Sequence, residues 1–401
     1  MHSSSLSPAL SRFAWLTAFC TWLLIGLGGL VTSKGVGMAV PDWPTSYGYN
    51  MFLFPIDQWI GGVFYEHTHR LLASAVGLLT AILTGWIWVR ETSGWRRRAG
   101  LIAIVITLGL VGVRTQGMFV VLACVALAFI VFGLSRAVVD ERPLRWWAAI
   151  AFATVLVQGV LGGLRVTAMV DQIGIFHGTL AQLFLVLLVL LALGTGGWLD
   201  RKAKHDQAGL PAALPKWLLG VTILILVQLM LGAAMRHQHA GLAVPDFPLA
   251  HGQLYPPTDA EAIQAYNVQR MDSRDFHSIT PFQVHLHMLH RMVALSLLLL
   301  VPWGALRFRA ATAGRDVPGR ALAGWWLALI GVQATLGVIT VLKNKPADIA
   351  TAHVMVGALC LVIGAVLTRV AREFSVATEN PVMQTHAHSR HPIGTTTPVI
   401  Q

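Results

Sequence analysis

The chain contains a series of apolar runs, each long enough to cross a lipid bilayer as a helix. An α-helix rises about 1.5 Å per residue, so the apolar core of a bilayer needs about 20 predominantly apolar residues. We expect ten spans, at about residues 13–32, 71–89, 99–114, 118–135, 146–164, 174–199, 217–235, 284–305, 321–342 and 350–368. Backbone polar groups in lipid must be paired within their own segment, so these runs predict an all-α polytopic membrane protein.

The composition and charge of the chain agree with this class. Of the 401 residues, 55% are hydrophobic and 12% are charged, whereas a soluble domain carries about 25% charged residues. The net charge of +11 does not indicate nucleic acid, because the basic residues gather in short loops. An N-terminus on the cytoplasmic side places most of these residues in cytoplasmic loops, as the positive-inside rule requires.

The segment 99–135 decides the number of spans. Its first apolar run is short and ends at Arg114. A single span here would reverse every later loop and turn four basic stretches outward, whereas two spans or a re-entrant hairpin keep those stretches inside. We therefore expect two spans in this segment, and ten in the whole chain.

One motif occurs twice, in two loops predicted on the outer side. Residues 37–48 read GMAVPDWPTSYG, and residues 241–252 read GLAVPDFPLAHG. Asp42 and Asp246 lie between prolines, a sequence that makes a rigid turn by itself. Both copies face the same side of the membrane, so the repeat is parallel, with its axis along the membrane normal.

The repeat divides the chain into two four-helix bundles. We expect an N-terminal bundle at 1–199 with an inserted hydrophobic hairpin at 99–135, a cytoplasmic linker at 200–216, a C-terminal bundle at 217–373 and a disordered tail at 374–401. Small residues near Gln158 and near Gln333 form a further matched pair, and they let helix backbones approach closely.

Each half carries two histidines near the outer ends of its apolar runs. These are His69 and His177 in the first half, and His290 and His353 in the second. A histidine inside a membrane is costly and marks a functional site, although a single one is equally explained by a hydrogen bond to a neighbouring helix. Paired imidazoles on neighbouring helices are a standard way to hold haem iron. Four in a twofold pattern predict axial ligands.

Charged residues next to these histidines differ between the two halves. Glu66 precedes His69 by three residues and shares its helix face, whereas the second half has His287 in that place. The difference suggests that one half performs chemistry, the alternative being a carboxylate stabilised by the helix dipole. Arg70 and Arg291 follow the ligand candidates directly. We expect them to pair with haem propionates, with snorkelling to the membrane surface as the alternative.

The chain resembles the haem A synthase family, which acts in cytochrome oxidase assembly. The resemblance is carried by the VPDWP loop, Glu66-x-x-His69-Arg70, Gln158-Gly159-x-Leu161-Gly162-Gly163, His177, His290-Arg291 and His353. It extends over residues 12–370, apart from the segment 99–135. It implies an enzyme that oxidises a ring methyl of haem O to a formyl group, giving haem A.

The resemblance also implies a division of labour between the halves. In the C-terminal half His290 and His353 would ligate haem b, the cofactor. In the N-terminal half His69 and His177 would hold the substrate haem O, and Glu66 would assist catalysis. The implied location is the bacterial inner membrane, in contact with lipid. Implied partners are a haem O synthase and cytochrome oxidase assembly factors, with the electron donor unidentified and no nucleic acid expected.

The chain departs from the family pattern in two ways. Some members carry a cysteine pair in the first outer loop, but Cys20, Cys124 and Cys360 all fall within predicted spans here. A mechanism that depends on those thiols cannot operate in this chain. The hairpin at 99–135 adds to the usual eight spans.

Two other functions remain open from the sequence. One is a bis-histidine cytochrome that passes electrons from quinol to a partner, and a weaker one is a haem transporter or chaperone. A carrier predicts two permanent haems of one type, whereas an enzyme predicts one fixed haem b and one exchangeable porphyrin with a farnesyl tail. The presence of Glu66 in one half alone favours the enzyme.

Overall fold

The computed structural model describes residues 7–111, 115–140, 143–197, 209–269 and 278–375. Its long helices are α1 (Pro8–Ser33), α2 (Gly61–Glu91), α3 (Gly94–Val111), α4 (Gln116–Val139), α5 (Leu144–Thr167), α6 (Ile173–Gly196), α8 (Ala213–His237), α10 (Pro281–Ala311), α11 (Arg320–Leu342) and α12 (Ala347–Ser375). Within the described residues, nine of these helices are long and apolar enough to cross a membrane. The predicted all-α polytopic membrane fold is confirmed.

Helix α3 corresponds to the predicted span at 99–114, but it is not among the nine helices that are long and apolar enough to cross a membrane. It begins at Gly94 and carries three arginines, Arg96 to Arg98, in its first turns, so that only its later part is apolar. Arg114, where the sequence places the end of this span, lies outside the described residues. The segment 99–135 is nonetheless two helices, of which α4 is long and strongly apolar.

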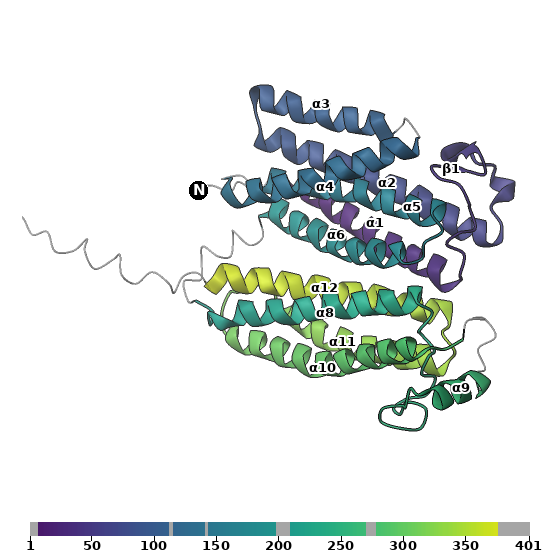
Figure 1. The fold of residues 1–401 in the computed structure, drawn as a ribbon. Helices are drawn as coiled ribbons and strands as arrows, with labels where there is room; N and C mark the ends of the chain where they lie inside the picture. The colour runs from purple at the N-terminus through teal and green to yellow at the C-terminus, as the bar shows by residue number, and fades with distance from the viewer. Residues whose placement is uncertain (1–6, 112–114, 141–142, 198–208, 270–277, 376–401) are drawn as a thin grey trace, which may run out of the picture.

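The helices of each half close a ring. In the first half α1 packs on α2, α2 on α5, α5 on α6, and α6 returns to α1. In the second half α8, α10, α11 and α12 close the same ring, and the two rings lie side by side (Figure 1). They meet through α1 against α12 and through α6 against α8 and α12. Since α1 corresponds to α8 and α6 to α12, the contacts α1–α12 and α6–α8 are equivalent under the repeat.

Helix backbones approach closely where α1 meets α12. The indole Nε1 of Trp22 donates to the carbonyl oxygen of Met355 at 3.1 Å. A Cβ added at Gly29 would lie 3.1 Å from Cγ2 of Thr351, and one added at Gly26 would lie 2.6 Å from Sδ of Met355. Two glycines of α1 thus set the spacing between the halves.

The inserted hairpin covers one side of the first ring. Helix α4 packs along α5, and α3 lies outermost, against α2 and α4 (Figure 1). Within the described residues, no additional helix packs along α11, the counterpart of α5. Accordingly 61% of the most apolar stretch of α5 is buried, against 11% of that of α11.

The predicted linker and tail fall mostly outside the described residues, which exclude 198–208 and 376–401. The end of the linker that is described returns to the last helix, where the amide of Leu210 donates to the carbonyl of Phe374 at 3.0 Å. Helix α12 runs to Ser375, two residues beyond the end predicted for the C-terminal bundle.

Both long loops lie at one end of the molecule, called the loop end below (Figure 1). The loop between α1 and α2 contains β1 (Thr45–Ser46), β2 (Tyr49–Asn50) and the 3-10 turns η1 (Met51–Leu53) and η2 (Ile56–Gln58), and the loop between α8 and α10 contains α9 (Ala260–Gln269). This common placement is what a parallel repeat requires.

Candidate functional site

The repeated loop motif folds in the same way in both halves. In the first loop the carboxylate of Asp42 accepts hydrogen bonds from the amides of Tyr47 and Gly48, at 2.6 and 2.8 Å. Asp246 does the same with the equivalent amides, at 2.7 and 2.8 Å. Burial by itself raises the pKa of both carboxyls, but the backbone N–H groups outweigh it, and both pKa values are lowered. These carboxylates close the turns.

Arg70 ties the first loop to helix α2. Its Nη1 donates to the carbonyls of Asp42 and Thr45, at 2.6 and 3.1 Å, and its Nη2 donates to the carbonyl of Val40 at 2.7 Å. Nη2 also donates to Oε1 of Glu66 at 2.6 Å, while Oε2 of Glu66 accepts from the amide of Val40 at 2.9 Å. All four terminal N–H groups of Arg70 are therefore in use.

Arg291 ties the second loop to helix α10 in the same manner. It donates to the carbonyls of Leu249, Val244 and Asp246, at 2.9, 3.1 and 2.7 Å. Both arginines predicted to meet haem propionates thus hold their own loops. Their pairing with propionates stays a prediction.

Among the described residues, an ion pair between this arginine and a carboxylate on its own helix occurs in the first half alone. Glu66 is 4% exposed and forms a buried ion pair with Arg70. The equivalent residue in the second half, His287, is 2% exposed. The replacement of Glu66 in the first half by His287 in the second is therefore a difference between two buried side chains.

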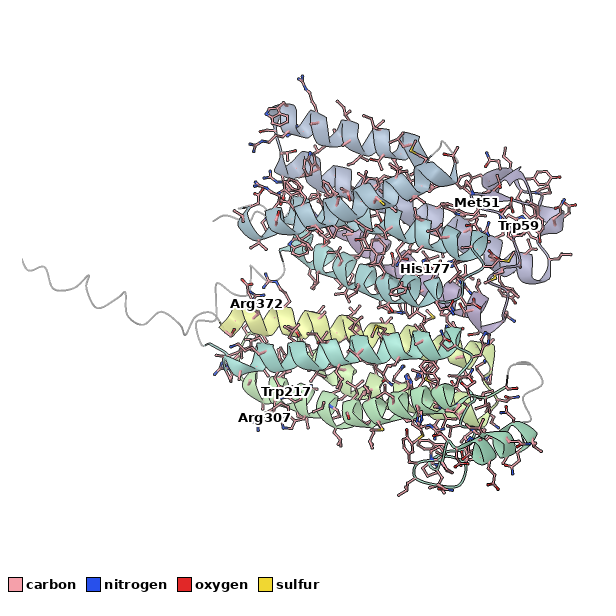
Figure 2. All side chains as sticks on the ribbon, in the orientation of Figure 1. Met51, Trp59, His177, Trp217, Arg307 and Arg372 are labelled. Carbon is pink, nitrogen blue, oxygen red and sulfur yellow. The ribbon has the colours of Figure 1, made fainter. Side chains whose placement is uncertain are left out.

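The structure brings the four predicted ligands together in two pairs. His69 on α2 lies within Coulombic range of His177 on α6, and His290 on α10 lies within that of His353 on α12. The expectation of neighbouring helices is wrong, because the two helices of each pair lie opposite each other in their ring. Figure 2 labels His177 near the loop end of α6. Among the described residues, the Nδ1 atoms of all four are buried without a hydrogen-bond partner. Such an atom costs about 1–3 kcal/mol, so four at repeated positions point to a bound group.

A glycine on a neighbouring helix faces each imidazole. The pairs are Gly28 of α1 with His69, Gly162 of α5 with His177, Gly232 of α8 with His290, and Gly337 of α11 with His353. A Cβ added at these glycines would lie 3.0, 3.4, 3.4 and 3.1 Å from Cε1 of the ring. A side chain at these positions would crowd the imidazole, so the glycines give the rings the space that they occupy.

Glutamines fix the backbone of two of the histidines. Nε2 of Gln158 donates to the carbonyl of His177 at 3.1 Å, and Nε2 of Gln228 donates to that of His290 at 3.0 Å. In both glutamines Oε1 is buried without a partner among the described residues. The sites therefore hold unpaired acceptors as well as unpaired ring nitrogens.

Gln333 completes this set, with Nε2 lying 3.4 Å from Nε2 of His353. Gln158 and Gln333 were recognised from the sequence, whereas Gln228 was missed. The pattern that identifies it is Gln-x-x-x-Gly, which ends at the histidine-contacting glycine on three helices. Residues four apart share a helix face, which explains why the glutamine and the glycine meet the same histidine.

The paired histidines fit the iron of haem better than a bare metal ion. No group of three or more His, Cys, Asp or Glu in the described part of the chain is placed to hold an ion. Haem iron needs only two axial ligands from the protein, because the porphyrin supplies the other four. Unpaired buried nitrogens beside glycines agree with this requirement.

The fold and the site define a class: a polytopic helical membrane protein with a histidine pair in each of two repeated bundles. Residues 112–365 match the COX15-CtaA family of cytochrome oxidase assembly proteins, and the chain belongs to this family. This confirms the resemblance found in the sequence.

Several relatives carry the name Heme A synthase. The protein from Methylobacterium radiotolerans is 27% identical over 92% of both chains. That from Sphingopyxis alaskensis is 25% identical over 94% of this chain and 98% of its own. That from a Bradyrhizobium species is 36% identical over 41% of this chain and 43% of its own.

Proposed function

We propose that this protein is a haem A synthase, which oxidises a ring methyl of haem O to a formyl group. The observation that carries the proposal is the repeated pair of histidines whose Nδ1 atoms are buried without a partner among the described residues, with the buried ion pair of Glu66 one helical turn before His69 in the first half. Family membership and the names of the relatives support it. The conversion removes four electrons from the methyl carbon, equivalent to two hydroxylations followed by loss of water.

We assign haem b, the resident cofactor, to His290 and His353, and the substrate haem O to His69 and His177. Bound haem supplies the one-electron and oxygen chemistry that side chains lack. The chain's own residues would hold the ring: the imidazoles would bind the iron, and the glycines give the imidazoles room to do so. The apolar helices around them exclude water from the site.

We assign Glu66 an assisting role in the first half. It lies one helical turn before His69, on the same face of α2. The amide of Val40 and the guanidinium of Arg70 hold its two oxygens, so its carboxylate has a fixed orientation. The second half has the ring of His287 in this place and no carboxylate, which suits a half that binds a permanent cofactor.

We place the protein in the bacterial inner membrane, with its N-terminus and the end opposite the loop end on the cytoplasmic side. Arg307 and Arg372 lie at that end (Figure 2), as the positive-inside rule requires. An enzyme that makes haem O must supply the substrate within the same membrane. Factors that assemble cytochrome oxidase must consume the product.

Extraction of the bound porphyrins tests the proposed function. The protein, produced together with a haem O synthase, is expected to yield haem b and, in addition, haem O, its hydroxylated form or haem A. Chromatography and mass spectrometry identify each species. Two equivalents of haem b that do not change with the supply of haem O would instead identify an electron carrier.

Substitution of the ligands tests their assignment. We expect His290→Ala or His353→Ala to remove the b-type absorbance band, because each leaves the iron with a single protein ligand. Survival of that band in both variants would refute the assignment of haem b to the second half.

The variant Glu66→Gln tests the carboxylate. The amide keeps the shape of the side chain and still accepts from Val40. The ion pair with Arg70 is lost, but Arg70 keeps its three hydrogen bonds to loop carbonyls, so the loop is expected to stay in place. Haem A production should fall at least tenfold while b-type absorbance remains. Glu91→Gln is the matched control, since Glu91 lies on the same helix, contacts Arg145 and is far from His69. Unchanged haem A production in Glu66→Gln would exclude the assigned role.

A further inference from the structure

Two arginines lie one helical turn beyond the glycines that contact the histidines. Arg165 follows Gly162 by three residues on α5, and Arg236 follows Gly232 by four residues on α8. Residues three and four apart share a helix face. Each arginine therefore lies on the face that meets an imidazole, about 5 Å closer to the loop end.

The repeat shows that each half has one such arginine, on a different helix. At the matching positions of the other two helices stand Thr32, four residues after Gly28, and Thr340, three residues after Gly337. The first half thus combines the threonine of α1 with the arginine of α5, and the second half combines the arginine of α8 with the threonine of α11. Each half therefore has one arginine beside its histidine pair, although the two arginines are not at equivalent positions of the repeat.

Both arginines act electrostatically on the histidine pairs. Arg165 lies within Coulombic range of His69 and of His177. Arg236 lies within Coulombic range of His353. Each cation is therefore close to the site of its own half, and the two cations also lie within Coulombic range of each other.

The negative charge around these two cations is incomplete. Within the described residues the one carboxylate at ion-pair distance is that of Asp171, 3.5 Å from Nη2 of Arg165, and its side chain is 40% exposed. Nε of Arg165 is buried without a partner among the described residues. Arg236 donates to the hydroxyl of Ser33, across the boundary between the halves. A partly buried cation without a full countercharge favours an anionic ligand.

The loop supports this arrangement of Arg165. A Cβ added at Gly37 would lie 2.7 Å from Nη1 of Arg165, so the first glycine of the repeated motif makes room for the guanidinium. The other candidates, Arg70 and Arg291, each have three of their four terminal N–H groups on loop carbonyls, and the fourth of Arg70 is on Glu66.

We propose that Arg165 and Arg236 bind the propionate carboxylates of the two porphyrins, Arg165 in the first half and Arg236 in the second. The inference rests on the proposed function, because it requires haem at both histidine pairs. Guanidinium groups bind carboxylates with two parallel hydrogen bonds, which would fix the rotation of each ring about its iron axis and turn its acidic edge toward the loop end. Both arginines are positioning residues.

Esterified haem provides the test. Haem b and haem b dimethyl ester are titrated into apoprotein in lipid nanodiscs, with His69→Ala present so that the second half alone binds. The ester should bind at least tenfold more weakly than the acid. In Arg236→Gln the affinity for haem b should fall by a similar factor, and the difference in affinity between haem b and its dimethyl ester should disappear. Haem O and its dimethyl ester test Arg165→Gln in the same way, with His290→Ala present.

Controls separate this contact from a structural role. Arg309→Gln, at the opposite end of α10, should leave the difference between acid and ester intact, because Arg309 donates to the carbonyl of Arg320. Arg236→Lys keeps the charge and should keep part of the difference, which also decides the matter if Arg236→Gln does not fold. If Arg291→Gln removes the difference and Arg236→Gln does not, the inference is overturned.

The failure of this inference and that of the proposed function give different results. Equal binding of acid and ester by the unsubstituted arginine sites overturns the propionate contact while haem binding, and with it the proposed function, stands. Binding of neither porphyrin overturns both.

Discussion

Arg70 and Arg291 hold equivalent loops, but their removal leaves different groups behind. Arg70→Gln leaves the carboxylate of Glu66 buried without its partner, a loss of about 3–5 kcal/mol. Arg291→Gln leaves only neutral carbonyls, a loss of about 1–3 kcal/mol. Thermal and denaturant unfolding in detergent should therefore rank Arg70→Gln as the more destabilised variant. Equal losses would mean that the ion pair contributes nothing beyond its hydrogen bonds.

The glycines that face the histidines give a second comparison between single residues. In Gly337→Ala the new methyl would lie 3.1 Å from Cε1 of His353, so the ring must shift. Gly331→Ala, on the same helix, meets nothing within 4 Å and gains up to about 1 kcal/mol of helix propensity. We expect a severalfold loss of haem b affinity in the first variant and none in the second, measured by titration of the b-type absorbance. Equal affinities would show that the ring does not need the space.

At the scale of the element, the two Asp-centred loops predict a response to acid. The pKa of Asp42 and that of Asp246 are lowered by folding, so their stabilisation of the loops is complete above the unfolded value of 3.8 and is lost as the pH falls through the folded value. Hydrogen exchange of residues 42–48, corrected for its intrinsic pH dependence, should stay constant from pH 7 to pH 5 and rise only below 3.8. In Asp42→Asn the protection should already be reduced at pH 7.

The elements show what the sequence reveals and what it does not. Apolar runs and repeated motifs predicted the helices and the four histidines, because bilayer thickness and duplication leave direct marks in the chain. The partners of Arg70 could not be predicted, because three of its four hydrogen bonds go to backbone carbonyls, which every residue carries. Gln228 was missed because its pattern becomes recognisable only when the glycine beside His290 is known.

At the scale of the whole molecule, the boundary between the halves depends on two glycines with unequal neighbours. Gly29 faces Thr351, which is buried, β-branched and bonded to the carbonyl of Ala347, so Gly29→Ala should cost about 1–3 kcal/mol. Gly26 faces the flexible end of Met355, which can move aside. Denaturant unfolding should give Gly29→Ala a lower free energy of unfolding than Gly26→Ala. The reverse order would show that Thr351 moves aside more easily than Met355.

The contact between α1 and α12 also sets an order of events in time. Trp22 and Met355 are separated by 333 residues along the chain. At a synthesis rate of about 5–20 residues per second, α12 is made roughly 20 to 70 s after α1. The first ring can close on its own as soon as α6 has been inserted, but the face of α1 that carries Gly26 and Gly29 stays exposed to lipid until the last helix arrives. The first histidine site can therefore be complete before this boundary forms, whereas the second needs His353 and is completed by α12, the same helix that forms the boundary.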